Sequence, residues 1–257
     1  MAIVEAKIAA VSYLNTVPFI YGIQHADELR AELLLSPPAD CARAFLNKTV
    51  DIALVPVGSL RMFDDAEIIT DFCIGAEKSV RTVVVMSNSP LNEVSTIWLD
   101  SHSMTSALLT KIIAVEQWGI KPDFKELIDY RAADSPRDGE AFLFIGDKVF
   151  DYEGRFKYTY DLANEWRDMT GKPFVFAVWI ARKGAVAEDV INALELSLTL
   201  GVERIWEAIV EHGHDNKEYA YPYLTENIDF LFDNQKRQAL ELFWEKGQKF
   251  VPRANPG

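Results

Sequence analysis

Cysteine is scarce in this sequence, and its spacing fits no metal or disulfide framework. Of the 257 residues only Cys41 and Cys73 are cysteines, and no CxxC pair occurs. Disulfide-stabilised domains are dense in cysteine, and thiolate metal sites use closely spaced pairs. We therefore expect both cysteines to be buried structural residues.

Positive charge is also in short supply. Lys and Arg number 26 against 39 Asp and Glu, which leaves a formal charge of −13. A chain of this charge repels nucleic acid and anionic membrane surfaces at long range. Neither is an expected partner, and a small-molecule substrate is expected instead.

No secretory signal or membrane span is readable. The first residues, MAIVEAKIAAVSYLN, carry Glu5 and Lys7 inside the apolar stretch and lack a cationic start. No run of roughly 18 or more apolar residues follows. We therefore expect a cytoplasmic protein.

Internal repeats, Gly/Ser linkers and charge blocks are absent as well, so the organisation must be read from alternating element types. Short apolar runs, each typical of a strand covered on both faces, recur along the chain. They are residues 7–11, 52–55, 82–86, 96–99, 141–145 and 174–180. Helix-start signals separate them at Pro18, at Pro37 with Asp40, and at residues 103–106. This alternation predicts an α/β fold.

The order of elements further predicts two lobes. Residues 187–211 and 227–249 have helical periodicity with no later strand signal. We expect residues 1–88 and 180–257, with the C-terminal helices, to form lobe 1, and residues 89–179 to form lobe 2. Two crossovers near residues 87–91 and 177–182 then suggest a hinge around a central cleft.

Four separated segments resemble chorismate dehydratase of the futalosine route to menaquinone. They read VSYLNTVPFIYGI at residues 11–23, SPPADCARAFLNKTVDIALVPVGSL at 36–60, CIGAEKSVRTVVVMS at 73–87 and YDLANEWRDMTGKPFVFAVW at 160–179. The resemblance covers residues 7–182. It implies a two-lobed type II periplasmic-binding-protein-like fold used as a lyase that converts chorismate to 3-[(1-carboxyvinyl)oxy]benzoate without a cofactor.

The resemblance also implies the site residues. Asn15 and Thr82 are the expected catalytic residues, and the expected substrate contacts are Ser12, Gly58, Arg81, Ser103, Thr105, Ser106 and Asp147. Two positions depart from the family pattern. Thr82 stands where the family usually has Ser, and Met104 stands where it usually has Arg.

Each main candidate also has a structural interpretation. Asn15 is placed to cap a helix, Thr82 begins a β-branched strand, and residues 103–106 suit a helix N-terminus that also binds anions. Arg81 suits a bidentate contact to a carboxylate of the dicarboxylate chorismate, because local positive potential is needed in this acidic chain. Lys78 and Lys148 are weaker candidates of the same kind.

Other chemistries find less support. The pair His212 and His214 has a metal-like spacing, but it sits where a helix stops at glycine, so no metal is expected. We expect Trp166 and Trp179 to lie in the core.

Two alternative functions remain. The sister enzyme 1,4-dihydroxy-6-naphthoate synthase would need a second-lobe histidine base, which FIGD (144–147) and YEGR (152–155) do not offer. A solute-binding protein for a small aromatic acid would need only affinity.

Overall fold

The computed structural model describes residues 3–101, 103–213 and 217–250. The chain divides into two compact units, each described separately below. Unit 1 comprises Met1–Glu77 and Val175–Asp233, and unit 2 comprises Lys78–Phe174 and Asn234–Gly257.

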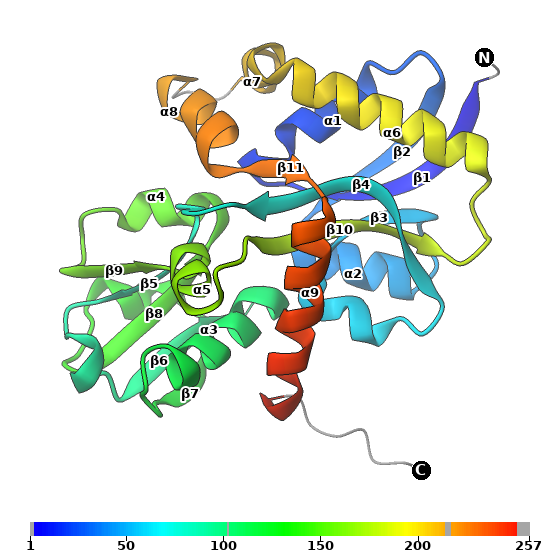
Figure 1. The fold of residues 1–257 in the computed structure, drawn as a ribbon. Helices are drawn as coiled ribbons and strands as arrows, with labels where there is room; N and C mark the ends of the chain where they lie inside the picture. The colour runs from blue at the N-terminus through cyan, green and yellow to red at the C-terminus, as the bar shows by residue number, and fades with distance from the viewer. Residues whose placement is uncertain (1–2, 102, 214–216, 251–257) are drawn as a thin grey trace. The chain divides into compact units, whose positions relative to one another are not determined.

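Unit 1 is built on a six-stranded mixed sheet (Figure 1). Its strand order is β11 (Asp229–Leu231), β4 (Ala66–Ala76), β10 (Phe174–Arg182), β3 (Ile52–Pro56), β1 (Val4–Val11) and β2 (Leu29–Ser36). β1 pairs in parallel with β2 and β3, whereas β10 is antiparallel to β3. Every residue of β3 is buried, which is why it reads as an unbroken apolar run.

Helices cover both faces of the unit 1 sheet. In Figure 1, α1 (Val17–Gln24) and α6 (Glu188–Glu203) lie together on one face and α2 (Pro38–Leu46) lies on the other. This follows from the strand order β3-β1-β2. The connection through α1 moves from β1 outward to β2, and the connection through α2 moves back past β1 to β3. Because both crossovers have the same handedness, the two helices lie on opposite faces. Helices α7 (Ile205–His212) and α8 (Lys217–Pro222) complete the unit.

Unit 2 is built on a five-stranded sheet. Its order is β7 (Asp123–Leu127), β6 (Thr96–Asp100), β8 (Glu140–Ile145), β5 (Val83–Ser87) and β9 (Tyr158–Asp161). The helices are α3 (Met104–Glu116), α4 (Val149–Tyr152), α5 (Leu162–Thr170) and α9 (Asn234–Gly247). Tyr152 of α4 stacks on Phe144 of β8 with 4.3 Å between ring centroids.

The last helix, α9, belongs to the core of unit 2. Phe243 packs edge-on against Trp166 and Phe174, with ring centroids 6.3 and 5.3 Å apart. Gly247 lies so close to α3 that an added Cβ would be 3.0 Å from the Leu108 side chain. Because buried aromatic contacts are strong, α9 is part of the unit 2 core although it lies at the end of the sequence.

The sequence-based α/β prediction is confirmed, and the six predicted strands all form. The expected division of the chain differs from the structure. The chain passes from unit 1 to unit 2 after residue 77 and returns after residue 174, whereas the expected boundaries were after residues 88 and 179. It passes to unit 2 once more after residue 233, so that α9 belongs to unit 2. The expectation of no strand after residue 227 is wrong, because β11 pairs with β4. A three-residue strand is too short to show a period of two.

The predictions for the core are also confirmed. Cys41, Cys73, Trp166 and Trp179 all have 0% exposure. The Trp166 indole N–H donates to the Pro173 carbonyl at 3.0 Å, so its polar atom is satisfied inside the core. Among the described residues, no helix is long and apolar enough to cross a membrane.

The contact of α1 with α6 yields a stability prediction. A Cβ built on Gly201 would lie 1.8 Å from the Pro18 carbonyl oxygen, and one built on Gly22 would lie 1.9 Å from the Ser197 carbonyl oxygen. Backbone cannot rotate away as a side chain can. We expect Gly201→Ala to lower the free energy of unfolding by about 3 kcal/mol or more, the upper end for overpacking. Urea unfolding measures this change.

The matched control for Gly201→Ala is Asn192→Ala, an exposed position on the same helix. It should change the free energy of unfolding by less than about 0.5 kcal/mol. Equal stability of Gly201→Ala and the parent would show that α1 and α6 do not depend on this close approach.

Candidate functional site

Three of the sequence-predicted residues gather at one edge of the unit 1 sheet. β1 and β3 run in parallel, so their carboxyl ends lie at the same edge. Ser12 follows β1 directly and is exposed, and Asn15 lies just beyond it and is half-buried. Gly58 follows β3 in the 3-10 turn Val57–Met62. Polar groups beyond strand carboxyl ends are a common arrangement for ligand sites in α/β folds.

Asn15 does not cap a helix. The N-cap of α1 is Thr16 and that of the preceding 3-10 turn, Leu14–Thr16, is Tyr13, and neither start has a side-chain cap bond. The Asn15 Oδ1 instead accepts a hydrogen bond from the Thr16 hydroxyl at 3.1 Å. The capping interpretation of Asn15 is therefore wrong, and its amide is not committed to the backbone of α1.

The other predicted residues gather at one edge of the unit 2 sheet. β6 and β8 are parallel, and the antiparallel β5 places Val83 opposite Ile145. The start of β5 therefore meets the ends of β6 and β8, and the Gly146 N–H donates to the Thr82 carbonyl at 2.8 Å. The residues at this edge are Arg81, Thr82, Ser103, Thr105, Ser106 and Asp147.

The predicted helix start at residues 103–106 is confirmed. Ser103 is the N-cap of α3, and its hydroxyl oxygen accepts a hydrogen bond from the Ser106 N–H at 3.0 Å. Ser103, Thr105 and Ser106 are buried. The N–H groups of this first turn give the edge a partial positive charge. Contact of Thr105 or Ser106 with a substrate stays a prediction.

Arg81 occupies an unusual backbone conformation beside this edge. Its φ is 61°, and the Thr82 N–H donates across it to the Val80 carbonyl at 2.7 Å. Its guanidinium lies 3.3 Å from a carboxylate oxygen of Glu153. Both side chains are more than one-third exposed, so this ion pair is weak and can exchange for another carboxylate.

Thr82 is less accessible than the resemblance implies. Thr82 is buried, with 1% exposure, and its hydroxyl donates to the Val80 carbonyl at 3.4 Å. In this conformation the hydroxyl supports the turn around Arg81. A catalytic role for Thr82 stays a prediction, as does substrate contact by the half-buried Asp147.

The unit 2 edge also contains an ion pair of which one partner, Asp100, is fully buried. The Lys148 ammonium lies 2.9 Å from the carboxylate of Asp100, whose side chain is fully buried at the end of β6. It also donates to the Tyr130 hydroxyl and lies 3.9 Å from the Tyr130 ring centroid. Of these three residues, the sequence pattern predicted only Lys148. Asp100 directly follows the apolar run 96–99, and an acidic residue in that place was a usable signal.

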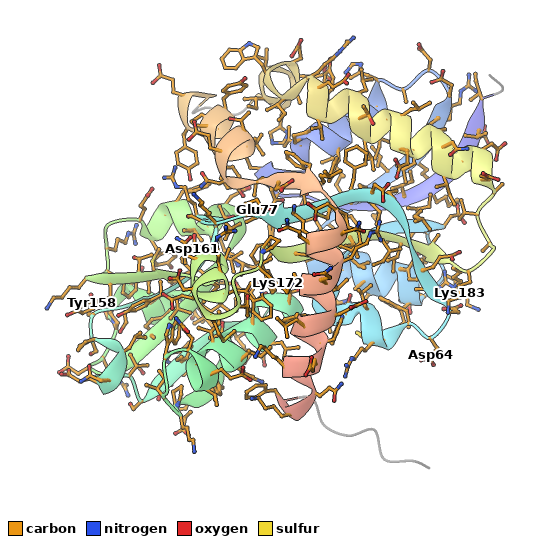
Figure 2. All side chains as sticks on the ribbon, in the orientation of Figure 1. Asp64, Glu77, Tyr158, Asp161, Lys172 and Lys183 are labelled. Carbon is orange, nitrogen blue, oxygen red and sulfur yellow. The ribbon has the colours of Figure 1, made fainter. Side chains whose placement is uncertain are left out.

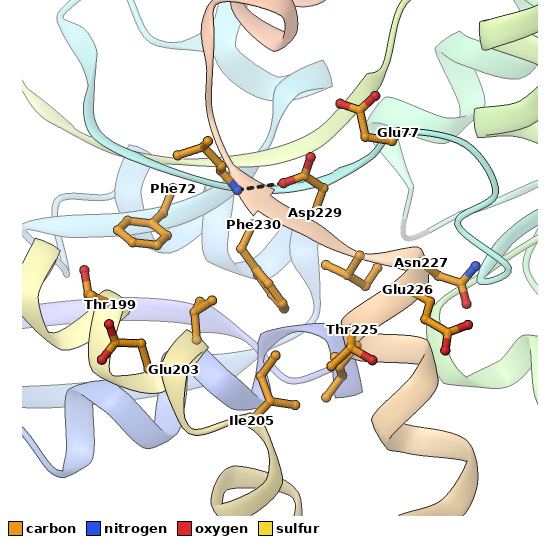
Figure 3. A pocket seen from close by; sticks show the side chains of 14 residues that line it. Phe72, Glu77, Thr199, Glu203, Ile205, Thr225, Glu226, Asn227, Asp229 and Phe230 are labelled. Carbon is orange, nitrogen blue, oxygen red and sulfur yellow. Dashed lines mark hydrogen bonds between the residues drawn. The ribbon is translucent and has the colours of Figure 1, made fainter.

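Unit 1 also contains a largely apolar pocket of about 640 Å³ (Figure 3). Phe72, Ile205 and Phe230 line it, and Figure 3 shows carboxylates around it. The acidic lining residues are Glu77, Glu203, Glu226 and Asp229. None of the predicted site residues is among its lining, and four carboxylates disfavour a dianionic ligand there.

A smaller pocket of about 300 Å³ in unit 1 includes Ser12 together with Glu211 and His212. His212 ends α7, and Gly213 follows with φ 73°, so the predicted helix end is confirmed. His214 lies outside the described residues. Among those that are described, no three His, Cys, Asp or Glu side chains gather as a metal site.

Solved structures share this architecture at low sequence identity. Protein AF1704 from Archaeoglobus fulgidus matches with a TM-score of 0.72 and 17% identity, over 96% of this chain and 97% of that one. The Candida albicans CA3427 product, described as having the generic periplasmic binding protein fold, matches at 0.68 and 12%, over 98% and 92%. The periplasmic aliphatic sulphonate binding protein SsuA from Escherichia coli matches at 0.64 and 15%, over 97% and 94%.

The chain is therefore an α/β protein with the periplasmic-binding-protein-like fold. Residues 6–249 match the family model described as menaquinone biosynthesis. That match spans nearly the whole chain, and the chain belongs to this family.

The Lys148 ammonium forms an ion pair with the buried Asp100 carboxylate, so its removal should destabilise unit 2. Lys148→Met leaves the Asp100 carboxylate buried without its ammonium partner. We expect a loss of about 2 kcal/mol in the free energy of unfolding, below the ~3–5 kcal/mol of a fully buried pair because Lys148 is partly exposed. Asp100→Asn in the same chain should restore most of the loss. Thermal and urea unfolding of both variants measure it.

Lys121→Met is the control, because Lys121 is an exposed lysine of the same unit. It should be close to the parent in stability. If Lys148→Met and Lys121→Met were equally stable, the Lys148–Asp100 pair would contribute nothing to folding.

Proposed function

We propose that this protein dehydrates chorismate to 3-[(1-carboxyvinyl)oxy]benzoate, as a cytoplasmic step in menaquinone biosynthesis. Family membership supports a role in that pathway. The observation that carries the particular step is the edge of unit 2, where Arg81 and the α3 N-terminus concentrate positive potential in a chain of charge −13. Such an edge suits a small dicarboxylate.

The chemistry asks little of the protein. One ring proton of chorismate and the neighbouring hydroxyl leave together as water, and the ring becomes aromatic. Aromatisation supplies the driving force, so binding in the right geometry and stabilising developing charge are the main tasks. No redox step occurs, and no cofactor is required by this balance.

Named residues divide these tasks. Arg81 is the proposed carboxylate contact, because its weak pair with Glu153 can exchange for a substrate carboxylate. The Lys148 ammonium is already bonded to Asp100 and Tyr130, which makes it a poorer direct contact. Asn15 offers an amide, free of helix capping, to charge that develops on the ring or to the departing hydroxyl.

Two other functions are less well supported. The naphthoate synthase of the same pathway would need a histidine base in an IHEG-like stretch, and the comparable segments FIGD (144–147) and YEGR (152–155) contain no histidine. A solute-binding role is suggested by the sulphonate-binding protein of the same fold. It would predict tight binding of an aromatic acid with no conversion.

We expect the purified protein to convert chorismate into an aromatic product lighter by one water, and to keep this activity in a chelator. Mass spectrometry of the reaction separates all three candidate functions. Binding without conversion would support the solute-binding alternative. Loss of turnover on chelation, with recovery on adding a divalent ion, would contradict the cofactor-free mechanism.

We expect Asn15→Ala to lower kcat about a hundredfold or more, the cost of removing a preorganised polar group that faces transition-state charge. Its thermal stability should hardly change, because Asn15 caps no helix. Arg81→Ala should chiefly raise KM, since a carboxylate contact exists before and during the reaction. Steady-state kinetics beside thermal melts measure both, and a parent-like kcat for Asn15→Ala would remove Asn15 from the mechanism.

A further inference from the structure

The carboxylate of Asp161 in unit 2 accepts five hydrogen bonds. Asp161 ends β9 and precedes α5 (Figure 2). It accepts hydrogen bonds from the Ser79 hydroxyl at 2.8 Å and from the backbone N–H groups of Val80 at 3.3 Å, Arg81 at 2.7 Å, Ala163 at 3.0 Å and Asn164 at 3.2 Å.

The two oxygens of Asp161 have different tasks. Oδ1 accepts from Ala163 and Asn164, which caps the start of α5, and it also accepts from the Val80 N–H at 3.3 Å. Oδ2 accepts from the Ser79 hydroxyl and the Arg81 N–H. Capping explains the bonds from Ala163 and Asn164. It gives no reason for the bonds from residues 79–81, which belong to a loop about eighty residues earlier in the chain.

That loop contains the strained residue of the predicted site. Arg81 is the middle residue of a three-residue turn with φ 61°, closed by the bond from Thr82 N–H to the Val80 carbonyl. Turns of this kind are rare for a residue with a side chain, and surrounding structure must hold them. In this turn the Asp161 carboxylate accepts the Arg81 N–H.

Asp161 is itself fixed in place by the sheet. β9 pairs with β5, and Asp161 lies opposite Val84, two residues beyond Thr82. The register therefore brings the carboxylate beneath the turn whenever the sheet forms. The Arg81 guanidinium, in contrast, forms an exposed ion pair with Glu153. Such an exposed pair is weak, so the charged end is less firmly fixed than the backbone.

We propose that Asp161 is a positioning residue for substrate binding: its Oδ2 holds Arg81 in the left-handed turn and so directs the guanidinium toward a substrate carboxylate. This inference rests on the proposed function and deepens it. Asp161 acts through Arg81 and does not contact substrate.

Asp161→Asn separates the two tasks. The asparagine oxygen can still cap α5, because Asn is as good an N-cap as Asp. Its amide nitrogen cannot accept from the Arg81 N–H or the Ser79 hydroxyl. Ser79→Ala is a milder second variant, which removes one bond on the loop side and leaves the α5 cap intact. Asp129→Asn is the matched control, since Asp129 also accepts from the backbone N–H of an arginine, Arg131, in unit 2.

The kinetic test is a double-mutant cycle on chorismate. We expect Asp161→Asn to raise KM about tenfold with kcat near the parent value, as for loss of a ground-state contact. Combined with Arg81→Ala, it should raise KM no further than Arg81→Ala does alone, because both changes remove the same contact. Asp129→Asn should match the parent. Effects of Asp161→Asn and Arg81→Ala that multiply would overturn the proposal.

A second readout needs no turnover. Hydrogen exchange of the Arg81 amide should be slow in the parent, faster in Ser79→Ala and fastest in Asp161→Asn. An exchange rate unchanged by Asp161→Asn contradicts the positioning role even if the enzyme is active. A parent that leaves chorismate unchanged contradicts the proposed function, whatever the exchange rates are.

Discussion

Strand pairing between distant parts of the chain is the constraint on which the rest of this structure depends. In unit 2, β5 lies between β8 and β9, and its antiparallel direction brings its first residue beside the last residue of β8. β6 runs parallel to β8, so its end lies at the same edge. Groups from residues 81, 103–106 and 147 meet there for this reason alone. A register slip of one residue would turn each side chain to the opposite face.

Charge gives this edge its chemical character. In a protein of charge −13, positive potential has to be concentrated locally to hold an anion. Unit 2 does so with Arg81 and the first turn of α3. The apolar pocket of unit 1 has the reverse character, since its lining includes Glu77 and Glu203. The two environments suit ligands of opposite kinds, which is why pocket volume is a poor guide to the substrate here.

A buried or half-buried carboxylate supports each cation of the unit 2 edge in a different way. Asp100 neutralises the Lys148 ammonium directly, at a separation of 2.9 Å. Asp161 leaves the Arg81 guanidinium alone and binds the Arg81 backbone. The first arrangement engages the charged group itself, and the second fixes the backbone that carries a charge whose exposed pair with Glu153 is weak. This difference is the physical reason for preferring Arg81 over Lys148 as the carboxylate contact.

The sequence by itself determined the strands that are buried on both faces, because an unbroken apolar run such as β3 can be stable only between two covered faces. It also determined the start of α3, since Ser103 and Ser106 form a local cap that needs no distant partner. Tertiary structure decided what depends on distant partners. Helix α9 joins unit 2 through Phe243 and its ring contacts, β11 pairs with β4, and the N–H of Arg81, in its positive-φ turn, donates to Asp161. Periodicity and capping are local properties of a chain, whereas each of these three features is stabilised by residues far away in the sequence.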